Sequence, residues 1–198
     1  MVSFTLDTNC VIAVEADDPE APAIRDLAEA HSAGKADVAV VAIMASEKQK
    51  SGATLESFEI FKNRLISLGL GHLGLCLPPL YFGLTFLGFS LWGSEEAIRL
   101  DASIHRILFP NIHPSLNDFC AERGLSSDVD IANRHKATWR NAKCDVLAIL
   151  SHIIARRDVF VSNDKNFHST AKKAKLLEIG AGRIEYPDAA RALLQRTS

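Results

Sequence analysis

Hydrophobic and polar residues follow one another along the chain in blocks that predict strands alternating with helices. Three short apolar runs have the length and composition of buried strands: VSFTL (2–6), DVAVVAIM (37–44) and VFVS (159–162). Helical spacing predicts helices between and after them: DTNCVIAVEA (7–16) capped by Thr8 or Asn9, 19–34 ending at Gly34, 46–67, 144–157 and 166–178. This order is typical of βαβ units. We therefore expect an α/β fold, a three-layer sandwich with a mainly parallel central sheet.

The middle of the chain, residues 68–140, is less regular. LGLCLPPLYFGLTFLGFSLWG (73–93) predicts one or two extended segments with turns at Pro and Gly. Helices are expected at 94–109, 115–124 and 128–143, and a last strand (183–186) and a helix beginning at Pro187 close the chain. We expect a single domain over residues 1–198, with 68–140 as an insertion or enlarged central region.

Composition narrows the class of protein. The 198 residues suit one domain, and a net charge of −2 excludes a broadly cationic nucleic-acid coat but not a local basic patch. The four cysteines lie far apart without a CxxC pair, which favours a reducing cytosol over a disulfide framework. The uncharged stretch 65–94 is broken by Pro78 and Pro79, so we expect no membrane span, and the first residues carry no secretion signal.

An acidic residue follows each of the three strand-like runs. These are Asp7, Glu47 and Asp164, while Asp145 opens the apolar helix that leads into the third run. Ligands of open α/β sheets bind outside the carboxyl ends of the strands, so the four carboxylates are expected at one edge. Carboxylates that lie close together repel each other unless they share protons or hold cations, and Mg²⁺ prefers oxygen ligands. The pattern therefore predicts a metal site.

The spelling around these acids resembles the PIN domain, a family of metal-dependent nucleases that includes the VapC-type toxins. The matching segments are LDTN (6–9), Glu47 after the second strand, KCDVLAI (143–149) and SNDKNF (162–167). The last carries the T/S-x-D-x-x-F pattern through Ser162, Asp164 and Phe167. The resemblance covers residues 1–67 and 141–186. It does not cover 68–140, and Asn166 stands where many relatives carry another Asp.

The resemblance implies an endoribonuclease, a hydrolase that cuts RNA phosphodiesters with metal-activated water and two bound Mg²⁺ or Mn²⁺ ions. Asp7, Asp145 and Asp164 would be the principal ligands, and Glu47 a ligand or an acceptor for metal-bound water. Asn9 and Ser162 would orient the carboxylates or the substrate phosphate. As a cytoplasmic toxin, the protein would pair with an antitoxin, and the apolar segment 68–93 would serve either homodimerisation or the core.

Two basic groups are candidates for contact with RNA. The first surrounds an aromatic residue just before Asp145 and consists of Arg134, Lys136, Trp139, Arg140 and Lys143. The second follows Asp164 and consists of Lys165, Lys172, Lys173 and Lys175. An aromatic ring among cations can stack on an unpaired base. A solvated helix with Trp139 packed inward explains the first group equally well.

Each acid also has a purely structural explanation. Asp7 could cap a helix, Glu47 could lie on a solvated helix face, Asp145 could form an ion pair and Asp164 could be a turn residue. Two other functions remain open. An aspartyl-phosphate phosphatase would need a second acid two residues after Asp7, where Asn9 stands. A non-catalytic PIN-like module would bind RNA or a protein without cutting.

Overall fold

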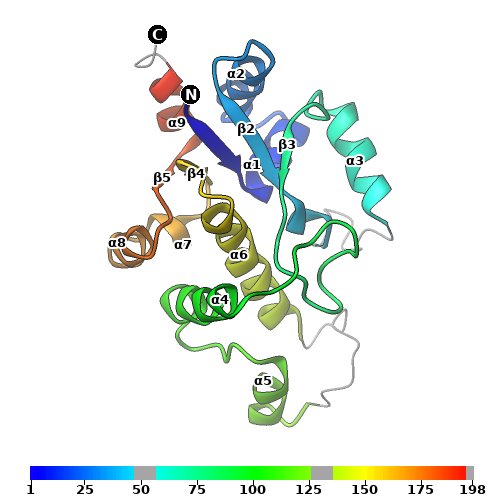
Figure 1. Ribbon diagram of the computed structural model, residues 1–198, viewed down its shortest axis with the longest axis vertical. Coiled ribbons are helices and arrows are strands. Elements are labelled where there is room, and N and C mark those ends of the chain that lie inside the picture. The colour runs from blue at the N-terminus through cyan, green and yellow to red at the C-terminus, as the bar shows by residue number, and fades with distance from the viewer. Residues whose placement is uncertain (47–56, 126–135, 195–198) are drawn as a thin grey trace.

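A central parallel sheet organises the computed structural model, which describes residues 1–46, 57–125 and 136–194 (Figure 1). In these ranges the sheet has five strands in the order β3-β2-β1-β4-β5, and every neighbouring pair is parallel. The strands are β1 (Ser3–Leu6), β2 (Asp37–Val41), β3 (Gly74–Cys76), β4 (Val159–Val161) and β5 (Arg183–Glu185). Helices flank the sheet, which confirms the predicted α/β three-layer fold.

The strand order reverses next to β1. The chain first builds outward from β1 through β2 to β3, and it later returns to the other side of β1 with β4 and then β5. Phe4 of β1 pairs in register with Val38 on one side and Val159 on the other, and all three are buried. The carboxyl ends of β1 and β4 are therefore neighbours at the topological switch point, where open α/β sheets bind ligands.

The helices form two groups. In the first, α2 contacts both α1 and α9; in the second, α6 contacts α4 and β2. The bounds are α1 (Thr8–Ala16), α2 (Ala21–Ser32), α3 (Phe58–Ser67), α4 (Glu95–Leu108), α5 (Leu116–Glu122), α6 (Ala137–Ile154), α7 (Lys165–His168), α8 (Thr170–Glu178) and α9 (Pro187–Leu194). The sheet lies between the layers, and the largest groups of buried apolar side chains come from α6 and α2.

Several predicted boundaries are corrected. The second apolar run leaves the sheet after Val41 and continues as a 3₁₀ helix, η1 (Ala42–Ser46). The helices expected at 128–143 and 144–157 are one helix, α6, over the described residues, because nothing from Ala137 to Ile154 breaks a helix. The helix expected at 166–178 is divided at Ser169, whose backbone is extended, into α7 and α8. Residues 47–56 and 128–135 of the predicted helices lie outside the described residues.

The central segment is tied to the rest of the fold. Its strand β3 pairs with β2 and forms one edge of the sheet, and its helix α4 packs on α6. Turns at 82–84 and 87–88 include Gly83 and Gly88, as the glycine pattern predicted, whereas no turn forms at Pro78 or Pro79. An isolated bridge, which the pattern did not predict, joins Pro79 to Leu91. Across the described ranges, no helix is both long and apolar enough to cross a membrane.

Candidate functional site

Asp7 lies at the carboxyl end of β1, where its backbone amide donates to the Val161 carbonyl at 3.0 Å. That bond extends the β1–β4 pairing by one residue. The residue is also the N-cap of α1, with extended backbone, and its Oδ1 accepts a hydrogen bond from the Thr8 amide at 2.8 Å. The expectation that Thr8 or Asn9 would cap this helix was therefore wrong. The carboxylate is only 5% exposed.

The second oxygen of Asp7 is held by two neighbouring side chains. Oδ2 accepts from Ser162 Oγ at 2.7 Å and from Asn9 Nδ2 at 2.6 Å. Asn9 in turn accepts the Asn163 amide on its Oδ1 at 2.9 Å. This ring of hydrogen bonds fixes the orientation of the Asp7 carboxylate and ties the end of β1 to the segment that follows β4.

Asp164 follows β4 and begins α7 as its N-cap. Its Oδ1 accepts from the Asn166 amide at 2.8 Å, and its own amide donates to Ser162 Oγ at 3.0 Å. The Ser162 hydroxyl thus bonds to the side chain of Asp7 and to the backbone amide of Asp164. The capping hydrogen bond uses only Oδ1 of Asp164. The other oxygen of this half-buried carboxylate can therefore also bind a ligand.

Three of the predicted acids meet at one solvent-open pocket of about 310 Å³. Asp7 comes from the end of β1, Asp164 from the start of α7 and Asp145 from the middle of α6. The other lining residues are Thr8, Asn9, Ile12 and Asn163. The pocket lies at the switch point of the sheet. Glu47 lies outside the described residues.

The electrostatics of the pocket favour a bound cation. Burial raises the pKa of Asp7 from 3.8 to about 6, against the opposing effect of hydrogen bonds from Ser162, Thr8 and Asn9. The neighbouring charge that contributes to this shift is a second carboxylate, Asp164, which raises the pKa further. A divalent cation would offset both the desolvation and the repulsion, and oxygen donors of this kind suit Mg²⁺ or Mn²⁺.

The acids share a pocket without forming a compact ligand group. Among the described residues, no three His, Cys, Asp or Glu side chains are close enough together to hold an ion. Joint coordination of one ion by Asp7, Asp145 and Asp164 therefore requires their side chains to turn toward one another. The donor types fit a hard divalent ion.

The basic group before Asp145 does not form an exposed surface. Lys136, Trp139, Arg140 and Lys143 are all buried. The Trp139 ring packs against Tyr81 with ring centroids 5.8 Å apart, and Lys143 Nζ donates to Asp101 at 2.6 Å and 2.7 Å. This burial does not support the predicted contact of these side chains with RNA, since Lys143 faces Asp101 of α4 and Trp139 faces Tyr81 of the central segment. Arg134 lies outside the described residues.

Other polar residues take different places. Lys165 is exposed at the start of α7, directly after Asp164. His168 donates through Nε2 to the Ser162 carbonyl at 2.8 Å, so it supports the backbone of the site. His152 is fully buried and holds Thr5 and the Ala181 carbonyl. Sequence reasoning missed Asn163, although its place between Ser162 and Asp164 was a usable signal.

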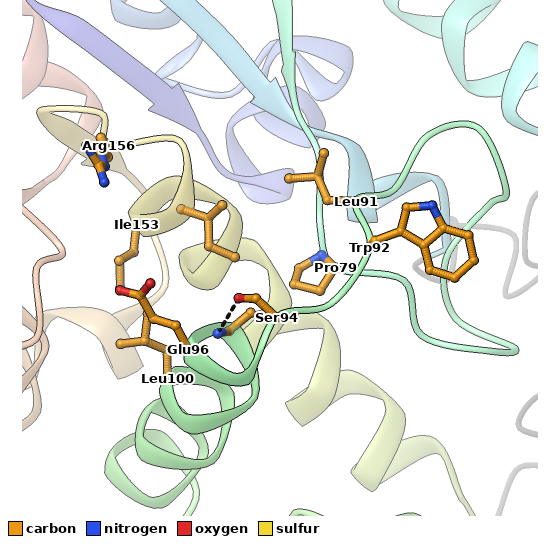
Figure 2. A pocket seen from close by; sticks show the side chains of 10 residues that line it. Pro79, Leu91, Trp92, Ser94, Glu96, Leu100, Ile153 and Arg156 are labelled. Atoms are coloured by element: carbon orange, nitrogen blue, oxygen red, sulfur yellow. Dashed lines mark hydrogen bonds between the residues drawn. The ribbon is translucent and has the colours of Figure 1, made fainter.

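A second pocket, of about 270 Å³, lies between the start of α4 and the end of α6 (Figure 2). Its lining is largely apolar, with Pro79, Leu91 and Ile153 among its members, and Glu96 and Arg156 are its charged residues. Figure 2 shows the Ser94 side chain accepting the hydrogen bond that caps α4. This lining lacks the gathered carboxylates of the pocket at the switch point, which is therefore the candidate site.

The sequence matches no protein-family model and no curated protein.

Proposed function

We propose that this chain is a divalent-metal-dependent nuclease, an endoribonuclease of the PIN-like kind. The observation that carries the proposal is the meeting of Asp7, Asp145 and Asp164 at one pocket, from three elements far apart in sequence. The pocket lies where the strand order reverses, so the fold itself favours a ligand there.

The three aspartates would hold the metal, with Mg²⁺ and Mn²⁺ as the ions that suit their oxygens. When bound, the ions would supply the positive charge that makes water nucleophilic and stabilises the leaving oxygen of a phosphodiester. No side-chain nucleophile is needed for that chemistry. Glu47 remains a candidate fourth acid.

The remaining residues of the site would act by holding this constellation in place. Ser162 and Asn9 fix Asp7 Oδ2, and the Thr8 amide fixes Oδ1, so the carboxylate cannot rotate freely. Orientation fixed before the substrate binds avoids part of the reorganisation cost of the reaction. Ser162 also ties the Asp164 backbone to Asp7, which couples the positions of the two acids.

RNA as the substrate rests on the resemblance to PIN domains. The pocket is compatible with a polynucleotide because it is open rather than enclosed, and exposed Lys165 directly follows its lining residue Asp164 in sequence. A single-stranded backbone could cross such a site without entering a tunnel.

Cleavage of a mixed single-stranded RNA pool tests the proposal. Wild type should cut with Mn²⁺ or Mg²⁺ and lose activity with EDTA, while Asp164→Asn should be folded and inactive. Asp188→Asn, an exposed carboxylate on α9 paired with Arg191, is the matched control and should cut like wild type. Equal cutting by wild type and Asp164→Asn would refute the assignment.

One observation favours the alternative of a non-catalytic PIN-like module. The described acids are not gathered into a compact ligand group, as they would be in a site already arranged for metal. Such a module would bind RNA or a protein without a need for divalent ions. RNA binding that is unaffected by EDTA, with no cleavage, would support it.

The partners expected from the resemblance are an antitoxin and a second copy of this chain. A toxin of this kind would be inhibited by a segment that covers the acid pocket. The segment predicted for dimerisation does expose large apolar side chains, at Phe82, Leu87 and Trp92. Light scattering of wild type and of a Phe82→Ser/Trp92→Ser variant would test for the dimer. If the dimer forms through this segment, wild type should have the mass of two chains and the variant the mass of one.

A further inference from the structure

A third pocket, of about 400 Å³, is lined by residues of α4 and α8. These two helices contact each other, and Figure 1 shows their ribbons. Both helices contribute polar and small apolar residues to it: Ser103, Arg106 and Ile107 from α4, and Ala171, Lys172 and Lys175 from α8. Arg106 was not among the residues that the sequence singled out, because only the fold brings α4 next to α8.

The charged groups in this lining are all cations. Arg106 and Lys175 are exposed, and each lies where its helix faces the pocket. The nearby carboxylate of α4 is engaged elsewhere, since Asp101 accepts both of its hydrogen bonds from Lys143. Ser103 donates its hydroxyl proton to the Arg99 carbonyl at 2.9 Å, so the accessible donors of the lining are the two cations, Arg106 and Lys175, whose charge suits a phosphate.

Lys172 gives the pocket a fixed geometry. Its ammonium group donates to the carbonyl of Leu108, the last residue of α4, at 2.7 Å, and also to Asn166 Oδ1. These bonds hold α8 against the end of α4. These contacts fix the two helices that line the pocket relative to each other.

The same lysine connects the pocket to the acid site. Asn166, which accepts from Lys172, donates its backbone amide to Asp164 Oδ1 at 2.8 Å. A single residue thus separates the basic pocket from a carboxylate of the acid pocket. A polynucleotide bound at the acids would reach the cations if its backbone extended past Asn166.

We propose that the pocket between α4 and α8 is a subsite for a backbone phosphate of the RNA strand, beside the bond that is cut. The inference rests on the proposed function, since it presumes that RNA crosses the acid pocket. Arg106 and Lys175 supply the charge that the acidic pocket lacks, and Lys172 maintains the walls. Phosphate contacts dominate nucleic-acid affinity, so this subsite would hold the strand where three carboxylates alone would repel it.

Fluorescence anisotropy of a short labelled single-stranded RNA, at several salt concentrations with Mg²⁺, tests the subsite. The Asp164→Asn background keeps the strand intact, and Arg106→Gln, Lys175→Gln and the double variant are compared in it. Each neutralised contact should weaken binding about fivefold at about 0.1 M salt and reduce the slope of log K against log salt by about 0.7. Lys35→Gln, an exposed lysine between α2 and β2, is the matched control and should leave the slope unchanged.

The outcomes separate this inference from the proposed function. A reduced slope in the double variant, together with cleavage by the otherwise wild-type chain, supports both. A reduced slope without any cleavage supports an RNA subsite in a protein that does not cut. An unchanged slope, an equal loss in Lys35→Gln, or no RNA binding at all would overturn the subsite, whether or not the wild-type chain cleaves RNA. Thermal denaturation of each variant confirms that the chain is folded.

Discussion

The Ser162 hydroxyl donates a hydrogen bond to Asp7 Oδ2 at 2.7 Å and joins residues 155 positions apart in sequence. The same Oγ accepts from the Asp164 amide at 3.0 Å and from Asn9 Nδ2 at 2.9 Å. One buried hydroxyl therefore holds the ends of β1 and β4 together at the switch point of the sheet. The relative positions of two of the three pocket carboxylates depend on it.

Ser162→Ala should weaken the site more than its size suggests. It leaves one buried carboxylate oxygen and two donors with a lost partner, which should cost about 1–3 kcal/mol of unfolding free energy. Groups that orient metal ligands typically matter by about 10- to 100-fold in metal affinity or activity, so we expect a loss in that range. Urea denaturation and the RNA cleavage assay measure the two effects.

Ser151→Ala is the control for that substitution. Ser151 is also buried, but its hydroxyl donates within α6 to the Leu147 carbonyl at 2.6 Å, away from the pocket. This variant should lose some stability and keep wild-type cleavage. Equal activity in the two variants would show that Ser162 does not organise the acids.

His152 should make the protein sensitive to acid. Its Nε2 donates to the Ala181 carbonyl at 3.0 Å, so its Nδ1 accepts from the Thr5 hydroxyl at 2.8 Å, and burial lowers the pKa to about 4. Since the folded-state pKa lies below the unfolded value of about 6.5, the unfolded chain binds the proton first. Stability should be complete above pH about 6.5 and fall by up to about 3 kcal/mol as the pH drops to about 4.

His152→Gln removes this titration. The variant should be less stable than wild type at neutral pH, yet its stability should fall less between pH about 6.5 and about 4. His113→Gln, in the segment between α4 and α5, should keep the wild-type fall. Parallel pH profiles for wild type and His152→Gln in urea denaturation would contradict the explanation.

The ion pair between Lys143 and Asp101 should act on stability rather than on RNA. Lys143 is 2% exposed as a side chain, so Asp101→Ala would leave a buried ammonium group without its carboxylate. Removal of one partner of a buried pair costs about 3–5 kcal/mol, and Asp101→Ala should approach that range. Glu95→Gln, which breaks the exposed pair with Arg99, should cost about 0.5 kcal/mol or less.

Lys143→Met provides the second half of that test. A long apolar side chain can fill the same space without a buried charge. The double variant Lys143→Met/Asp101→Leu should therefore be less destabilised than Asp101→Ala. The salt dependence of RNA binding should match that of wild type. A reduced salt slope in Lys143→Met would restore this lysine as an RNA contact.

The sequence predicted the parts of the fold that local pattern determines. β1, β4, α2 and α4 follow from apolar runs and helical spacing. The Ser94 cap of α4, which accepts the Ala97 amide, was not predicted. The acids at the ends of the strands were also predictable, because chain order places them after strands and parallel strands bring their ends together.

What the sequence could not show was which side of a helix faces inward. For the basic segment with Trp139 and Lys143 the sequence left both orientations open, and the structure packs Trp139 against Tyr81 and pairs Lys143 with Asp101 of α4. Arg106 and Lys175 are 69 positions apart, and only the packing of α4 on α8 makes them neighbours. The orientation of α6 and the proximity of Arg106 to Lys175 both depend on tertiary contacts that local spacing does not encode.

Titration of Mn²⁺ into the metal-free protein by calorimetry tests the central claim most directly, that three carboxylates from three elements form one cation site. Wild type should bind the ion, and Asp7→Asn, Asp145→Asn and Asp164→Asn should each weaken that binding strongly, while Asp188→Asn binds like wild type. The same binding heat in all four variants, or none in wild type, would contradict the account.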